Sequence, residues 1–75
     1  MNTERSNKVR AGRYIREWQG YRLYNAEDED PNVLVIVDQD GNSALFNAGL
    51  RNWEDFEDLL ALLYDDLVND RLEWR

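Results

Sequence analysis

Residues 33–47 read VLVIVDQDGNSALFN, and this stretch decides the fold. Val33 to Val37 is an unbroken apolar run of mostly β-branched residues, which is typical of a strand in the middle of a sheet with both faces covered. The next residues, Asp38–Asn42, are turn formers, and Ser43–Asn47 is then expected to return antiparallel. The stretch therefore predicts a β-hairpin.

A second hairpin is predicted upstream, around a two-residue turn at Gln19-Gly20. This turn places Glu17 opposite Arg22 as a cross-strand ion pair, which supports the register. The same register pairs Trp18 with Tyr21 and Arg16 with Leu23. It puts Tyr14, Trp18, Tyr21 and Leu23 on one face of the sheet, and Ile15, Glu17, Arg22 and Tyr24 on the other.

The C-terminal part of the chain has the period of an amphipathic helix. Asn52 is expected to cap it, and acidic residues crowd its first turns, where the helix dipole favours them. Arg71 and Arg75 follow at the other end. The apolar face consists of Trp53, Phe56, Leu59, Leu60, Leu63, Tyr64 and Leu67. We expect Trp53, Phe56, Leu60, Leu63 and Leu67 to form the main core with Val35, Phe46 and Trp18.

These elements predict one α+β domain spanning residues 1–75, an antiparallel β-meander of three to four strands with one long C-terminal helix packed on one face. Residues 1–12 have no clean period and are expected to be a flexible basic arm. One helix covers only one face of residues 33–37. The N-terminal segment or a second subunit is therefore expected to cover the other face.

The composition excludes several classes of site. The 75 residues include no Cys and no His, which excludes disulfides, the usual zinc ligands and His-based acid–base catalysis. A small domain without disulfides favours a reducing compartment, and we expect the cytoplasm. The apolar run at residues 33–37 is too short to span a bilayer, and the N-terminus does not resemble a signal peptide.

Two arrangements of acidic residues resemble chemical sites. Asp38, Asp40 and Asn42 resemble part of a calcium loop, but Gly41 is at the wrong position, and a hairpin turn explains all of them. A glycosidase-type carboxylate pair needs a cleft, for which a chain of this size leaves little room. We therefore expect no enzyme activity, no catalytic residue, no metal and no cofactor.

Charge is unevenly distributed along the chain, whose net charge is −7. Residues 1–22 carry six basic and two acidic side chains, whereas residues 23–75 carry fourteen acidic and three basic ones. Such asymmetry indicates electrostatic recognition. The acidic part would repel phosphates, so direct binding of nucleic acid by that part is excluded.

The polar face of the predicted helix is the main candidate binding surface. It holds Glu54, Asp55, Asp58, Asp65, Asp66, Asn69 and Glu73, with Leu62 pointing outward among the carboxylates. A face that serves only solubility normally mixes signs, and that is the competing interpretation of this surface. Helical spacing of roughly 6 and 10 Å lets such a row imitate the phosphates of a duplex strand. Leu62 would be an apolar anchor, and a second acidic block comprises Glu27, Asp28, Glu29 and Asp30.

The basic N-terminal segment leaves alternatives open. Its interleaved aromatic residues Tyr14, Trp18 and Tyr21 suit either a nucleic-acid-binding strand pair or, as we favour, the core under the helix. Its arginines Arg10, Arg13 and Arg16 suit pairing with the acidic surface of a second copy, which would give a homodimer.

In size, charge and two-layer organisation the chain resembles the small acidic proteins that phages use against bacterial defences, the anti-CRISPR inhibitors and other DNA mimics. The resemblance covers the whole chain as a general style, and no motif carries it. It implies stoichiometric inhibition of a bacterial defence complex, in the cytoplasm of the bacterial host cell, through the basic nucleic-acid-binding groove of that complex. The alternative is a small adaptor, immunity protein or antitoxin whose acidic helix docks on one specific basic protein.

Overall fold

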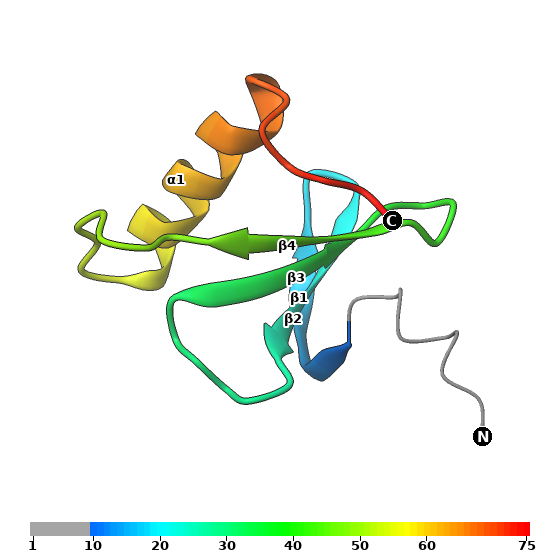
Figure 1. Cartoon of the computed structure of the whole chain (residues 1–75), viewed down its shortest axis with the longest axis horizontal. Coiled ribbons are helices and arrows are strands. Elements are labelled where there is room, and N and C mark those ends of the chain that lie inside the picture. The colour runs from blue at the N-terminus through cyan, green and yellow to red at the C-terminus, as the bar shows by residue number, and fades with distance from the viewer. Residues whose placement is uncertain (1–9) are drawn as a thin grey trace.

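The computed structural model describes residues 10–75, which form a four-stranded antiparallel sheet and one helix (Figure 1). The elements are β1 (Ala11–Trp18), β2 (Tyr21–Ala26), β3 (Val33–Val37), β4 (Ser43–Asn47) and α1 (Phe56–Val68). The strands lie in the sheet in their sequence order, so each pairs with the next along the chain. The predicted α+β meander with one C-terminal helix is confirmed.

Next to its turn, the β1–β2 hairpin has the predicted register, with Glu17 opposite Arg22 and Trp18 opposite Tyr21. Gln19 and Gly20 have φ values of 54° and 82°, as a two-residue hairpin turn that follows the twist of the strands requires. The predicted ion pair is wrong, because Glu17 and Arg22 do not pair within residues 10–75. Exposed ion pairs contribute little stability, so the register does not depend on this one.

β1 is irregular, and this irregularity corrects the predicted face of Tyr14. The register shifts between Ala11 and Tyr14 and again between Tyr14 and Arg16. As a result Tyr14 lies opposite Tyr24, with the two rings edge to face at 5.4 Å, on the side away from the helix. Ile15, which was expected on that side, packs against the core instead. A β-bulge reverses the alternation of side chains, which sequence periodicity alone does not show.

The core lies between the sheet and α1. From β3 it takes Leu34 and Ile36, whose neighbours across the β4 ladder are Phe46 and Ala44. Val35 is also buried, but it alternates onto the opposite face with Tyr24 and Leu45, so its predicted contact with the helix is wrong. The remaining predicted core residues do join this cluster: Trp18, Phe46, Trp53, Phe56, Leu60, Leu63 and Leu67.

The predicted N-terminal arm falls mostly outside the described residues. Of its described part, Ala11 and Gly12 belong to β1. A Cβ atom at position 12 would come within 2.6 Å of the Ala26 carbonyl oxygen, so the pairing of β1 with β2 requires glycine there. The expectation that the arm or a second subunit covers the outer face of β3 stays a prediction.

The helix starts later than predicted. Its N-cap is Asp55, whose side chain accepts a hydrogen bond from the Asp58 N–H at 3.0 Å, whereas Asn52 lies outside the helix. After the C-cap, Asn69, the chain returns to the sheet. There Trp74 stacks on Tyr21 at 5.7 Å, and Arg75 forms two backbone hydrogen bonds with Ser43 at the edge of β4.

Within residues 10–75, α1 is too short and too polar to cross a membrane.

Candidate functional site

The carboxylates of α1 do not form the single outward row that the sequence predicted. The buried stripe of the helix is rotated relative to the expected one, so that it runs through Leu59, Leu63 and Asp66. Asp66 is consequently buried, and Leu62 is partly buried against the core. Both were expected to point into solvent. Tyr64, which was expected in the core, is half exposed.

Asp66 is buried because two arginines bind its carboxylate. Arg51 donates to its two oxygens at 3.1 and 3.3 Å, and Arg71 donates to Oδ1 at 3.1 Å. The hydrogen bonds from Arg51 hold the pKa of the Asp66 carboxyl below its ordinary value, against the effect of burial. This is a folding contact that ties the helix to the segments before and after it.

Three further helix carboxylates also have local structural partners. Asp65 accepts from Arg71 at 2.7 Å. Asp55 caps the helix by accepting from the Asp58 N–H, and Asp58 in turn accepts from the Glu54 N–H at 3.1 Å, just before the helix. Part of the predicted acidic face therefore has a role in folding.

The second acidic block, Glu27–Asp30, forms the exposed β2–β3 loop. Glu27 pairs with Arg10 at 3.3 Å. Asp28 and Asp30 each accept a hydrogen bond from a backbone N–H two residues ahead, at 3.1 and 2.9 Å, which sets the course of the loop. Glu29 has a left-handed backbone (φ 63°), and its side chain has no partner among residues 10–75.

The structure brings this loop together with the start of the helix. The Trp53 indole N–H donates to the Asn32 side chain at 2.8 Å, and the Ala48 N–H donates to the Asn32 carbonyl at 2.8 Å. Both contacts lie where β3 begins and β4 ends, which is one end of the sheet (Figure 1). We call the carboxylates of the loop and of the helix start at this end of the sheet the acidic end: Asp28, Glu29, Asp30, Glu54, Asp55 and Asp58.

Of the predicted binding residues, Asp65 and Asp66 do not belong to this surface, since both lie near the far end of α1. Glu27 lies beside it. Sequence reasoning missed Leu50, which is fully exposed in the β4–α1 loop at this same end of the sheet. A signal was present, because Leu50 follows the strand-breaking Ala48-Gly49 and has no role in a helix or strand.

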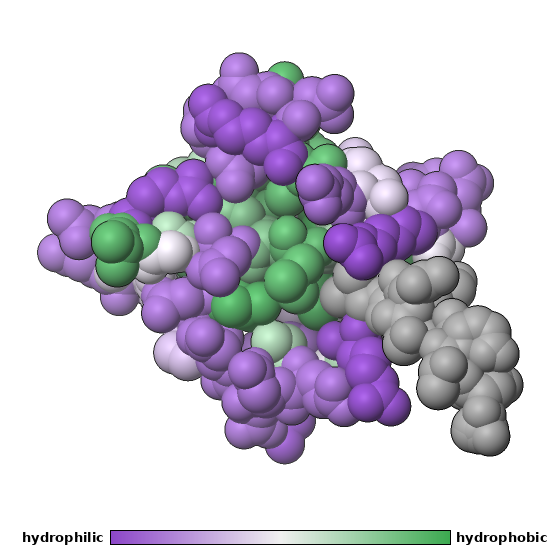
Figure 2. Space-filling model, viewed as in Figure 1, coloured by the Kyte–Doolittle hydropathy of each residue, from purple (hydrophilic) through white to green (hydrophobic). Residues whose placement is uncertain are grey.

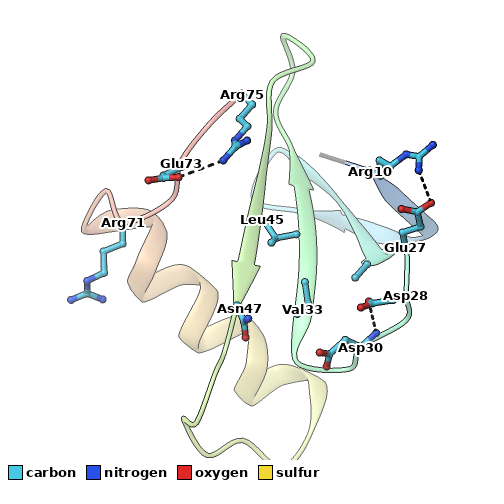
Figure 3. Close-up of a pocket in the computed structure, with 11 residues that line it drawn as sticks. Arg10, Glu27, Asp28, Asp30, Val33, Leu45, Asn47, Arg71, Glu73 and Arg75 are labelled. Atoms are coloured by element: carbon cyan, nitrogen blue, oxygen red, sulfur yellow. Dashed lines mark hydrogen bonds and ion pairs between the residues drawn. The ribbon is translucent and has the colours of Figure 1, made fainter. Parts of the chain in front are cut away.

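A hollow of about 870 Å³ lies beside the acidic end, and it was not predicted. Figure 2 shows apolar surface at the centre of that view, surrounded by hydrophilic side chains. The floor of the hollow includes Ala26, Val33 and Leu45. Its rim carries Arg10, Glu27, Asp28 and Asp30 on one side and Arg71, Glu73 and Arg75 on the other (Figure 3). The rim thus presents both signs of charge, and it shares Asp28 and Asp30 with the acidic end.

The segment Asp38–Asn42, which resembles part of a calcium loop in sequence, is a hairpin turn in the structure. Asp38 Oδ1 accepts from the N–H groups of Asp40 and Asn42, both at 2.9 Å. In the part of the chain from Arg10 onward, no group of three or more His, Cys, Asp or Glu side chains is placed so that it could hold a metal ion.

No protein-family model, no curated protein and no solved structure matches this chain.

Proposed function

We propose that this protein is a non-catalytic inhibitor that places its acidic end in the basic groove of a nucleic-acid-binding protein. The observation that carries the proposal is the contact between Asn32 and Trp53, which are 21 residues apart in sequence. This contact joins the two acidic segments. Their carboxylates come from a loop and from a helix N-terminus, so the surface has two sources of negative charge. Such a surface attracts a protein whose groove is built for phosphates.

The charge balance at this end supports the proposal. The nearest arginine in sequence, Arg51, is already engaged with the buried Asp66. Two other arginines pair with acidic residues beside this surface, Arg10 with Glu27 and Arg16 with Glu57. The side chains of Glu29 and Glu54 have no ion-pair partner within residues 10–75 and are free to meet cations of another protein.

The resemblance to anti-CRISPR inhibitors would make the target a bacterial defence complex, and the corresponding location would be the bacterial cytoplasm. For any target, the proposed inhibitor occupies the groove in which that target binds nucleic acid. Duplex DNA should therefore compete with the protein for its target. An adaptor or immunity protein that docks elsewhere on its partner would not show this competition.

The test reverses charge without removing a hydrogen bond that shapes the fold. Glu29→Lys combined with Glu54→Lys should slow association at low salt by roughly tenfold or more, because charges of this kind govern encounter rates. The probe is the fraction of a bacterial lysate that elutes from a duplex DNA column. Retention of these proteins on the immobilised chain, and their displacement by duplex DNA, are measured.

The matched control is Asp40→Lys with Asp70→Lys, which makes the same change in net charge elsewhere. Asp40 lies in the β3–β4 turn at the opposite end of the sheet, and Asp70 follows the far end of α1. The control should bind like the parent apart from a small uniform loss. Equal rates for the two double variants would show that net charge alone matters and would refute the proposal. Retention that DNA does not displace would favour the adaptor.

A further inference from the structure

Leu50 has an apolar side chain, but its position gives that side chain no role in the fold. It is fully exposed, so it buries nothing in the core. It occupies the third position of a tight turn, Ala48–Arg51, which the Arg51 N–H closes by donating to the Ala48 carbonyl at 3.1 Å. Turn positions favour Gly, Asn, Asp, Ser and Pro, and leucine has no conformational advantage there.

The turn that carries Leu50 is held firmly on both sides. Gly49 supplies the positive φ of 64°, and its N–H donates to the Asn47 side chain at 2.8 Å. The Arg51 guanidinium donates to the carbonyls of Ala48 and Asn47 at 3.0 and 3.1 Å. It also lies over the Phe46 ring at 5.3 Å from the centroid and binds the buried Asp66.

This arrangement presents a single apolar side chain on an ordered turn. A side chain on a pre-ordered turn loses little backbone entropy when it enters a partner, which lowers the cost of binding. Leu50 also lies at the same end of the sheet as the acidic end, in the loop that leads to Glu54. An apolar anchor within a charged surround is a common organisation of interface hot spots.

We propose that Leu50 is the anchor of the interface and enters an apolar socket beside the basic groove of the partner protein. This inference rests on the proposed function and adds to it, because a phosphate groove alone offers no site for leucine. The partner must therefore combine a cationic groove with an adjacent apolar depression. The carboxylates set the encounter rate, and Leu50 sets the lifetime of the complex.

The experiment uses the full chain and the same DNA-binding fraction as probe. Leu50→Ala should speed the dissociation of the retained, DNA-displaceable proteins by roughly tenfold, with association almost unchanged. Leu50→Met should restore slow dissociation, since it keeps an apolar side chain of similar size. Val68→Ala is the matched control, because Val68 is more than half exposed at the far end of α1. Its dissociation should equal that of the parent.

A photo-crosslinking residue at position 50 provides a second measurement. It should crosslink to a retained protein, and the crosslink should disappear when duplex DNA is added, whereas the same residue at position 68 should not crosslink. If Leu50→Ala dissociates like the parent while the Glu29 and Glu54 reversal binds slowly, the anchor is refuted and the proposed function stands. If the parent retains no DNA-displaceable protein, both are refuted.

Discussion

Leu63→Ala should lower the free energy of unfolding by about 2–5 kcal/mol, which is a large part of the stability of a domain of this size. Leu63 is completely buried at the centre of the stripe by which α1 contacts the sheet. The substitution removes apolar contacts and leaves a cavity that the close-packed β-strand side chains of Leu34, Ile36 and Phe46 cannot fill. Urea unfolding followed by Trp fluorescence measures the loss.

Val68→Ala is the control for this prediction. It removes an exposed β-branched side chain from the last position of the same helix and should change stability by no more than about 0.5 kcal/mol. An unfolding midpoint of Leu63→Ala equal to that of Val68→Ala would contradict the described packing of α1 on the sheet.

Asp66→Asn should cost about 1–3 kcal/mol at neutral pH, because Asn keeps the size of Asp but loses the charge that two arginines bind. We expect less than the full cost of breaking a buried ion pair, since the side chains of Arg51 and Arg71 are 37% and 54% exposed. The lost stability should come mainly from weaker attachment of α1 to the segments before and after it.

This prediction has a distinct dependence on pH. The pKa of Asp66 is lower in the folded than in the unfolded chain, first because of the hydrogen bonds from Arg51. Its stabilisation is therefore complete above the unfolded pKa of about 3.9 and is lost as the pH falls through the folded pKa. In this acid range the free energy of unfolding should fall more steeply with decreasing pH for the parent than for Asp66→Asn. The two free energies should converge at the acidic limit of the range.

Asp70→Asn is the matched control, because it removes an exposed carboxylate with no ion-pair partner among residues 10–75. It should follow the parent within about 0.5 kcal/mol at every pH. Unfolding curves in urea between pH 7 and pH 2 measure all three proteins. A constant difference between the parent and Asp66→Asn at all pH values would exclude a role for the Asp66 charge.

The elements of this fold could be predicted because local patterns determine them. The run Val33–Val37 and its turn gave a strand and a hairpin with the observed bounds, and Gln19-Gly20 fixed the register of the first hairpin. The face of each side chain was harder to predict. Tyr14 was misplaced by a bulge, and Val35 was misplaced because an all-apolar strand does not reveal which of its faces meets the helix.

The candidate site was predictable as a charge pattern and not as a surface. A helical wheel assigns Asp66 to solvent, since the arginines that neutralise it are distant in sequence or lie beyond the helix. Leu62 then shifts inward with the rotation of the buried stripe. The joining of the two acidic segments depends on the Asn32–Trp53 contact, which spans 21 residues and has no local signature.

The irregular register of β1 has a consequence for the behaviour of the protein at high concentration. β1 is an edge strand of the sheet, and a regular edge strand is a template on which other molecules can extend the ladder and aggregate. Its two register shifts interrupt the even spacing of donors and acceptors that such an extension needs. Exposed Arg13 adds a charged side chain to this edge, which also disfavours pairing with a strand of another molecule. We therefore expect the distortion that turns Tyr14 away from the helix also to hinder the joining of sheets from neighbouring molecules.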